Sequence, residues 1–326
     1  MRSRTSAAIV VSLLALAVSA CSIGANSSSH IKPDWVSGAS KNYPASSYIT
    51  GIGSERYQKH AKTAAVNAIL KSFTYVRDTG LPAYLGSDNM QRKAKPLQEA
   101  LTNKIQIVDT WYDDGDRRYH AFAIVTKQYV GEQILELISS LDNTTRHHIE
   151  RAGVTPDKLQ KIVHAGKALQ AQVVRSFYTD IMKNIDPGNS RARLIWQVAR
   201  LREDFEKLLG RIRVKPLITN DDLGVLRPSL IGSLQAGNFG IAQAGQADYL
   251  LESSLVVNDR KKSGGKTQVQ AELSINLLGT DRQSHGKQTW PVAFIDGPGE
   301  PGIGACRELL DRELLPAILD FAVQDK

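Results

Sequence analysis

The period of hydrophobic and polar positions changes several times along the chain, and each change predicts a new element. Between Thr267 and Leu278 apolar and polar residues alternate strictly, which predicts a strand with one buried face. Between Leu159 and Ile181 apolar residues recur every three or four positions, which predicts a long amphipathic helix. Because both periods occur repeatedly, we expect an α+β fold.

Residues 48–143 carry the pattern of a first small domain. A short strand breaks at Gly51 and Gly53, and an alanine-rich helical stripe follows it. Two further strands flank Asp113-Asp114-Gly115-Asp116, a turn sequence typical of a hairpin, and a second helix ends near Leu141. The order predicts an antiparallel sheet with helices on one side.

Residues 144–210 predict a long helical hairpin. The first helix begins after Thr155 with a proline in its first turn and stops at Asp186-Pro187-Gly188. A second stripe runs from Leu194 to Leu209, so we expect two antiparallel helices joined by a tight turn.

Residues 211–326 predict a second small antiparallel-sheet-plus-helix domain. A strand from Ile212, a helix over 228–234, several strands ending with the alternating one, and a closing helix follow in that order. The closing helix places Cys306 on its apolar side, and Gly297 to Gly302 form a glycine-proline loop before it.

The first 20 residues have the pattern of a secretory signal peptide. Arg2 and Arg4 precede an apolar run over 7–18 that is too short to span a bilayer. The run ends at Val18, Ser19 and Ala20, directly before Cys21, a sequence that resembles the lipobox of bacterial lipoproteins. This resemblance implies a covalent lipid of the palmitate type on Cys21 and, because Ser22 is not aspartate, the outer membrane facing the periplasm. If Cys21 is lipidated, residues 21–47 are expected to be a lipidated flexible tether. The alternative is an ordinary cleaved signal with a chance cysteine.

Composition agrees with a folded protein of the cell envelope. Hydrophobic residues make up 42% of the 326, and the net charge of +8 favours anionic partners. Only two cysteines occur, so a lipidated Cys21 would leave Cys306 without a disulfide partner.

Two family resemblances follow from these residues. Residues 33–142 resemble the LPP-twenty outer-membrane lipoproteins. The motifs that carry this resemblance are Pro33-Asp34-Trp35-Val36, the strand ending Thr50-Gly51-Ile52-Gly53, the alanine helix and the hairpin at Trp111-Tyr112. This implies attachment or scaffolding, with no known catalytic residues. Residues 211–323, with Ala247-Asp248-Tyr249 before the long alternating strand, resemble the periplasmic domain of curli-secretion lipoproteins and of the penicillin-binding-protein activator LpoB.

No motif in the chain predicts catalysis or a metal site. Gly51-Ile52-Gly53 lacks the third glycine of a dinucleotide loop, and the acidic turn at 113–116 lacks the downstream glutamate of a calcium loop. His147, His148 and His164 do not have metal-ligand spacing, so we expect surface histidines at a domain junction. Cys306 near a helix start is a candidate nucleophile, against the alternative of a buried cysteine.

One stretch is strongly basic. Residues 191–215 contain eight basic residues and three acidic ones. This excess of positive charge predicts either a solvated helix face or a patch for an anionic partner such as lipopolysaccharide, cell-wall glycan or an acidic protein. Too few aromatic residues accompany it for nucleic acid. The eight are Arg191, Arg193, Arg200, Arg202, Lys207, Arg211, Arg213 and Lys215.

Together these patterns predict an outer-membrane lipoprotein that faces the periplasm. We expect it to serve as a scaffold or accessory subunit of an envelope machine. No catalytic activity and no cofactor other than the covalent lipid are expected. Cell-wall synthase activation and flagellar or secretion assembly are the machines considered. The alternative is a periplasmic ligand-binding protein or hydrolase.

Overall fold

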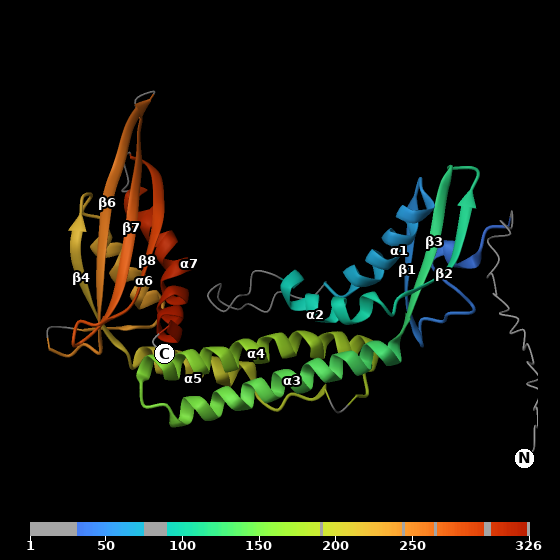
Figure 1. The fold of residues 1–326 in the computed structure, drawn as a ribbon, viewed down its shortest axis with the longest axis horizontal. Coiled ribbons are helices and arrows are strands. Elements are labelled where there is room, and N and C mark those ends of the chain that lie inside the picture. The colour runs from blue at the N-terminus through green and yellow to red at the C-terminus, as the bar shows by residue number, and fades with distance from the viewer. Residues whose placement is uncertain are drawn as a thin grey trace, which may run out of the picture.

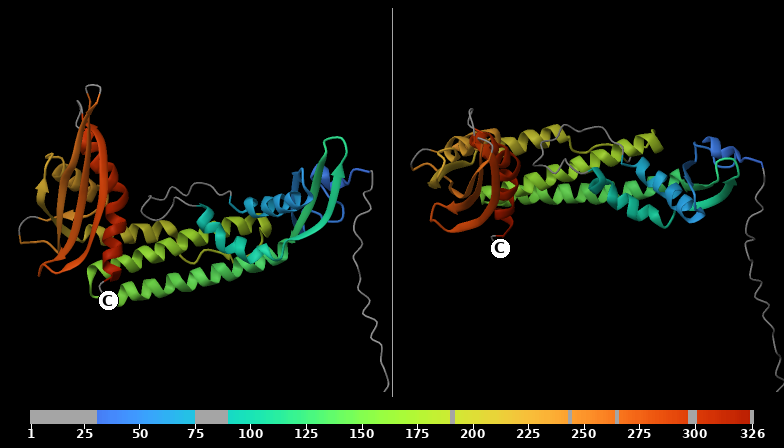
Figure 2. Two further views of the ribbon diagram at one scale, coloured as in Figure 1. Left: turned by 45° about the horizontal axis from the view of Figure 1, so that its top comes forward. Right: turned by 90° about the horizontal axis from the view of Figure 1, so that it is seen from above.

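The computed structural model describes residues 31–74, 90–189, 192–242, 245–263, 266–296 and 301–324. Two α+β units stand on the two ends of a base of long helices (Figures 1 and 2). The predicted α+β fold class is therefore confirmed. The signal peptide, Cys21 and the first part of the predicted tether lie outside the described residues.

The first unit is a three-stranded antiparallel sheet with helices on one face. The strand order is β1-β3-β2, and α1 packs closely against β1 and β3. Gly51 and Gly53 let this helix approach, because a Cβ on either would lie within 2.3 Å of a backbone oxygen of α1. The elements are β1 (Tyr48–Glu55), α1 (Gln58–Ser72), α2 (Met90–Thr102), β2 (Gln106–Asp113) and β3 (Arg118–Thr126).

The opposite face of this sheet is covered by the segment that enters it. The short 3-10 helix η1 (Asp34–Ser37) buries Trp35, whose ring stacks on Phe122 at 5.3 Å between centroids. The Trp35 indole Nε1 also donates to the Asp109 carboxylate at 2.8 Å. A flexible tether through residue 47 was therefore the wrong expectation for residues 33–47, because an aromatic ring buried this fully holds its segment against the sheet.

Two 28-residue helices, α3 (Lys127–Val154) and α4 (Lys158–Ile185), form the base as an antiparallel pair. The predicted end of the first of these near Leu141 is wrong, and the expected boundary at residue 143 falls inside α3. The helix continues through Asp142, whose carboxylate is paired with Arg175 of α4. The predicted partner of α4, α5 (Val198–Gly210), also packs on α4, but residues 186–197 connect them in place of a tight turn.

The second unit is a five-stranded sheet in the order β5-β4-β6-β7-β8, with α6 and α7 packed together against it. The pairs β6–β7 and β7–β8 are antiparallel, but β4 pairs in parallel with both β5 and β6, so the expected all-antiparallel sheet is wrong. The helix α6 between β4 and β5 is the crossover that makes a parallel neighbour possible. The elements are β4 (Arg213–Asp221), α6 (Leu226–Ala236), β5 (Gly240–Ile241), β6 (Tyr249–Ser263), β7 (Lys266–Gly279), β8 (Ser284–Asp296) and α7 (Pro301–Gln324).

The helix α4 contributes to the cores of both units. Leu159, Ile162 and Val163 near its start pack with α7 and the second sheet. Phe177 and Ile181 near its end pack with α1 and the first sheet. The two units are therefore joined through one continuous helix. Among the described residues, no helix is long and apolar enough to cross a membrane.

Candidate binding site on the helical base

A buried polar cluster joins α3, α4 and the chain segment that leads to α5. The Arg175 side chain is fully buried, and its Nε and Nη2 atoms donate to the Asp142 carboxylate at 2.8 and 3.2 Å. Its Nη1 donates to the carbonyl of Ala192 at 3.1 Å, and Nη2 donates to the carbonyl of Arg193 at 2.8 Å. Arg175 therefore holds the segment after residue 191 against the helix pair, using the planar donor set of a guanidinium.

That segment forms one wall of a groove. The groove has a volume of about 530 Å³ and lies between α3, α4, α5 and residues 195–197. Its lining is mostly apolar, with three alanines and one tryptophan. The lining residues are Ile149, Ala152, Ala165, Ala168, Ile195, Trp196, Gln197, Arg200, Leu201, Asp204 and Leu208.

The polar members of this lining come from α5 and the residue before it. Arg200 and Asp204 lie one helical turn apart, and both are exposed. Neither forms an ion pair within 4 Å among the described residues. The pKa of Glu203 is lowered mainly by the hydrogen bond from Lys207, and the Arg200 charge adds a smaller contribution in the same direction. The groove therefore combines an apolar floor with charged groups at one side, a combination typical of ligand sites.

The spacing of residues on α3 and α4 indicates room beside the two helices but does not by itself predict a site. Ala165 and Ala168 on α4, like Ile149 and Ala152 on α3, are spaced three residues apart, so each pair lies on one helix face. Small residues at that spacing leave room beside a helix, but only the placement of residues 195–197 turns this room into a groove.

The predicted basic patch is not gathered on one element. Arg191 lies outside the described residues, Arg193 precedes α5, and Arg213 and Lys215 lie on β4. Lys207 is paired with Glu203 at 2.6 Å, and the Arg213 guanidinium donates to Gln246 at 2.8 Å. Of the seven that the structure describes, Arg200 alone lines the groove. Arg202 is half-buried on α5, and Arg211 is exposed at its end.

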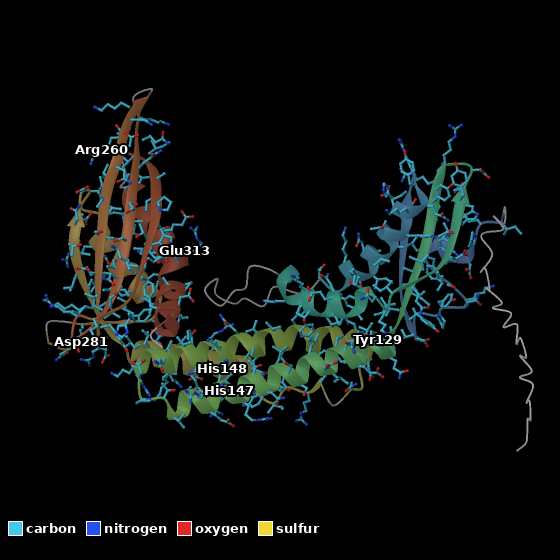
Figure 3. The ribbon with its side chains drawn as sticks, viewed as in Figure 1. Tyr129, His147, His148, Arg260, Asp281 and Glu313 are labelled. Carbon is cyan, nitrogen blue, oxygen red and sulfur yellow. The ribbon has the colours of Figure 1, made fainter. Side chains whose placement is uncertain are left out.

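The three histidines lie on the base, and two of them meet across it. His148 of α3 and His164 of α4 are half-buried, with their Nδ1 atoms 3.0 Å apart, whereas His147 is exposed (Figure 3). The pKa of His148 is lowered from its usual value, first by burial and then by the charges of His164, Lys167 and His147. His148 and His164 each precede a groove residue in sequence, and they form a contact between the helices.

This contact predicts that the protein is less stable in mild acid. Because the folded pKa of His148 lies below its unfolded value of 6.5, the unfolded chain binds more protons as the pH falls through that range, and stability is lost. We expect the urea midpoint to fall between about pH 7 and about pH 5.5, and His148→Gln to flatten this slope relative to the exposed control His147→Gln. If the urea midpoint changed equally with pH in the wild type and in His148→Gln, the loss of stability could not be attributed to His148.

The position of Cys306 in the fold argues against the candidate nucleophile and favours the alternative of a buried cysteine. This cysteine is fully buried within the second core, and burial raises the pKa of its thiol to about 11. The helix start does not lower this pKa, because the desolvation penalty on a thiolate dominates. The hydrolase alternative therefore has no supported candidate nucleophile. Residues 297–300 of the glycine-proline loop lie outside the described residues.

The acidic hairpin turn brings Asp113, Asp116 and His120 close together, with one ligand atom of each within 4.8 Å of the others. Sequence spacing had not linked His120 to this turn. The Asp113 carboxylate accepts from the Gly115 amide at 2.9 Å, and Asp116 accepts from the Arg118 amide at 3.1 Å. These bonds identify both aspartates as turn-forming residues.

Comparisons with known proteins give only distant similarities. No protein-family model matches the sequence, and no curated protein matches it. The secreted protein HP1454 from Helicobacter pylori is similar in structure, with a TM-score of 0.38 and 13% identity over 85% of this chain and 96% of that one. Protein XCC0632 from Xanthomonas campestris, of family DUF330, has a TM-score of 0.25 and 17% identity over 35% of this chain and 86% of that one. A minor lipoprotein from Acinetobacter baumannii has a TM-score of 0.22 and 14% identity over 34% and 85%.

Similarities this distant carry no functional argument. The resemblances to LPP-twenty lipoproteins and to the curli-secretion and LpoB type of domain stay predictions.

Proposed function

We propose that this protein is an outer-membrane-anchored lipoprotein, attached through a lipid on Cys21, that serves as a non-enzymatic scaffold or accessory subunit of a cell-envelope machine. The observation that supports this best is the sharing of α4 between the two cores. A shared helix holds two units at a fixed separation, which is what a spacer between two partners requires.

The dimensions fit such a spacer. A 28-residue helix is about 42 Å long at 1.5 Å per residue. The described chain begins beside the first unit, and the 13 residues from Cys21 to Pro33 can extend at most about 45 Å. The first unit then stays near the membrane, while the second, at the far end of the base, is available to a partner.

Lipidation of Cys21 is tested by metabolic labelling with an alkyne-bearing palmitate analogue. We expect label and membrane pelleting for the wild type, and neither for Cys21→Ala. The matched control is Cys306→Ser, because Cys306 is the second cysteine of the chain and lies in the core. Label on Cys21→Ala equal to wild type would contradict an anchor at this residue.

The scaffold role is tested with photoreactive residues at the two ends of the molecule in living cells. One replaces exposed Asp114 at the hairpin tip of the first unit, and the other replaces exposed Arg260 near the tip of β6 (Figure 3). We expect two different, reproducible sets of envelope proteins, both lost in Cys21→Ala. If neither position captures a defined protein in the anchored form, the scaffold role is wrong.

The ligand-binding alternative is favoured by one specific observation, the groove on the helical base.

A further inference from the structure

We propose that the groove between α3, α4 and α5 binds the hydrocarbon chain of a single-chain amphiphile with an anionic head group. Free fatty acids and anionic lysophospholipids share this chemistry. The inference rests on the groove and does not depend on the scaffold role.

The size of the groove favours a small molecule over a protein. Its volume of about 530 Å³ lies in the range of about 300–1,000 Å³ that is typical of ligand pockets. Eleven residues line it, whereas a stable protein interface engages about 20–30 residues on each side. A folded partner would therefore have to extend well beyond the groove.

The apolar lining matches an aliphatic chain. Ala152, Ala165 and Ala168 provide a floor without bulky side chains, and Trp196 provides a wide apolar wall. Ile195 beside it is 62% exposed, so part of the wall remains in contact with water. An aliphatic chain in the groove would remove this surface from water, and its free-energy gain grows with the apolar area covered.

The charges at the groove favour an anionic head, with one opposing group. Arg200 is in no ion pair among the described residues, so its guanidinium is available to a carboxylate or phosphate. Asp204, one turn further along α5, repels the same head group. Lys207 is on the same helix but is paired with Glu203 and does not line the groove.

Photoaffinity labelling tests the proposal on the acylated full chain in phosphatidylcholine vesicles. The probes are palmitate and palmitoyl-lysophosphatidylglycerol, which is anionic through its phosphodiester, each with a diazirine on the chain, and a matching neutral monoacylglycerol. We expect label on residues 149–152 and 195–197, mapped by mass spectrometry, and weaker labelling by the neutral probe. The stronger of the two charged probes identifies the source of the ligand.

Two matched pairs of variants separate binding from nonspecific labelling. Ile195→Asp places a charge in the groove wall at an exposed site and should reduce labelling by about fivefold or more, whereas Leu194→Asp, exposed but outside the lining, should not. Arg200→Gln should reduce labelling by the charged probes about threefold, and Lys207→Gln should not. Asp204→Asn should increase it.

Labelling that is unchanged in Ile195→Asp, or spread evenly over both units, would overturn the groove as a lipid site. Equal labelling by the neutral and charged probes would overturn the anionic head group. The variants at positions 194, 195, 200 and 207 all change exposed residues, so loss of folding is not expected to obscure the result.

Discussion

Replacing Arg175 with alanine is expected to lower the free energy of unfolding by about 3–5 kcal/mol, the usual cost of leaving a buried charge without its partner. Asp142 would lose both of its hydrogen bonds from the guanidinium, and the carbonyls of Ala192 and Arg193 would lose theirs from it, although Ala192 keeps a longer bond of 3.4 Å from the Thr179 hydroxyl. Urea denaturation followed by far-ultraviolet circular dichroism measures the change.

The matched control is Arg146→Ala. Arg146 is exposed on α3 and, among the described residues, hydrogen-bonds only to Asn143 of its own helix, so its loss should change stability by less than about 0.5 kcal/mol. Replacing Arg175 by methionine together with Asp142 by leucine should recover much of the loss, since neither charge then remains buried. A cost below about 1 kcal/mol for Arg175→Ala would show that the cluster is not essential to the base.

Replacing Gly53 with alanine is expected to cost about 3 kcal/mol or more, at the upper end of overpacking effects. The added Cβ would lie 2.1 Å from the Ala61 carbonyl oxygen and 2.4 Å from the Ala65 nitrogen. Both atoms belong to the backbone of α1, so no side-chain rotation relieves the clash, and the helix must move off the sheet. The midpoint of thermal unfolding measures the effect.

Gly153→Ala is the control for the chemistry of this substitution. Gly153 lies in the last turn of α3, and a Cβ there meets no atom within 4 Å. Alanine should stabilise the helix by about 0.5–1 kcal/mol. If Gly53→Ala were as well tolerated as Gly153→Ala, the close contact between β1 and α1 would be wrong.

Much of the second unit could be predicted from local pattern. The alternation in β7 holds in the structure, with Val269, Ala271, Leu273, Ile275 and Leu277 all buried. The strand β8 was missed because its sequence is polar at the start and contains Pro291. It is an edge strand, paired on one side only with β7, and proline is tolerated at a sheet edge.

The candidate site could not be predicted in the same way. The sequence placed eight basic residues close together, but the fold distributes the seven that the structure describes over the segment before α5, the helix α5 with its C-terminal end, and the strand β4. Arg200 lines a groove because the fold brings it together with Trp196 and Ala165, which belong to different parts of the base. The approach of His148 to His164, sixteen positions apart, likewise required α3 to continue past Leu141.

The sequence alone determined the α+β class and the order of most elements, because these depend on residue periodicity. It predicted a strand that breaks at Gly51 and Gly53, whereas β1 runs through both glycines to Glu55 and only the fold shows that they admit α1. Only the tertiary structure decided that α4 serves both cores, that Trp35 holds the entering chain on the first sheet, and that β4 pairs in parallel. Each of these is a contact between residues far apart in the chain, and neither local propensity nor spacing specifies which distant surface a face will meet.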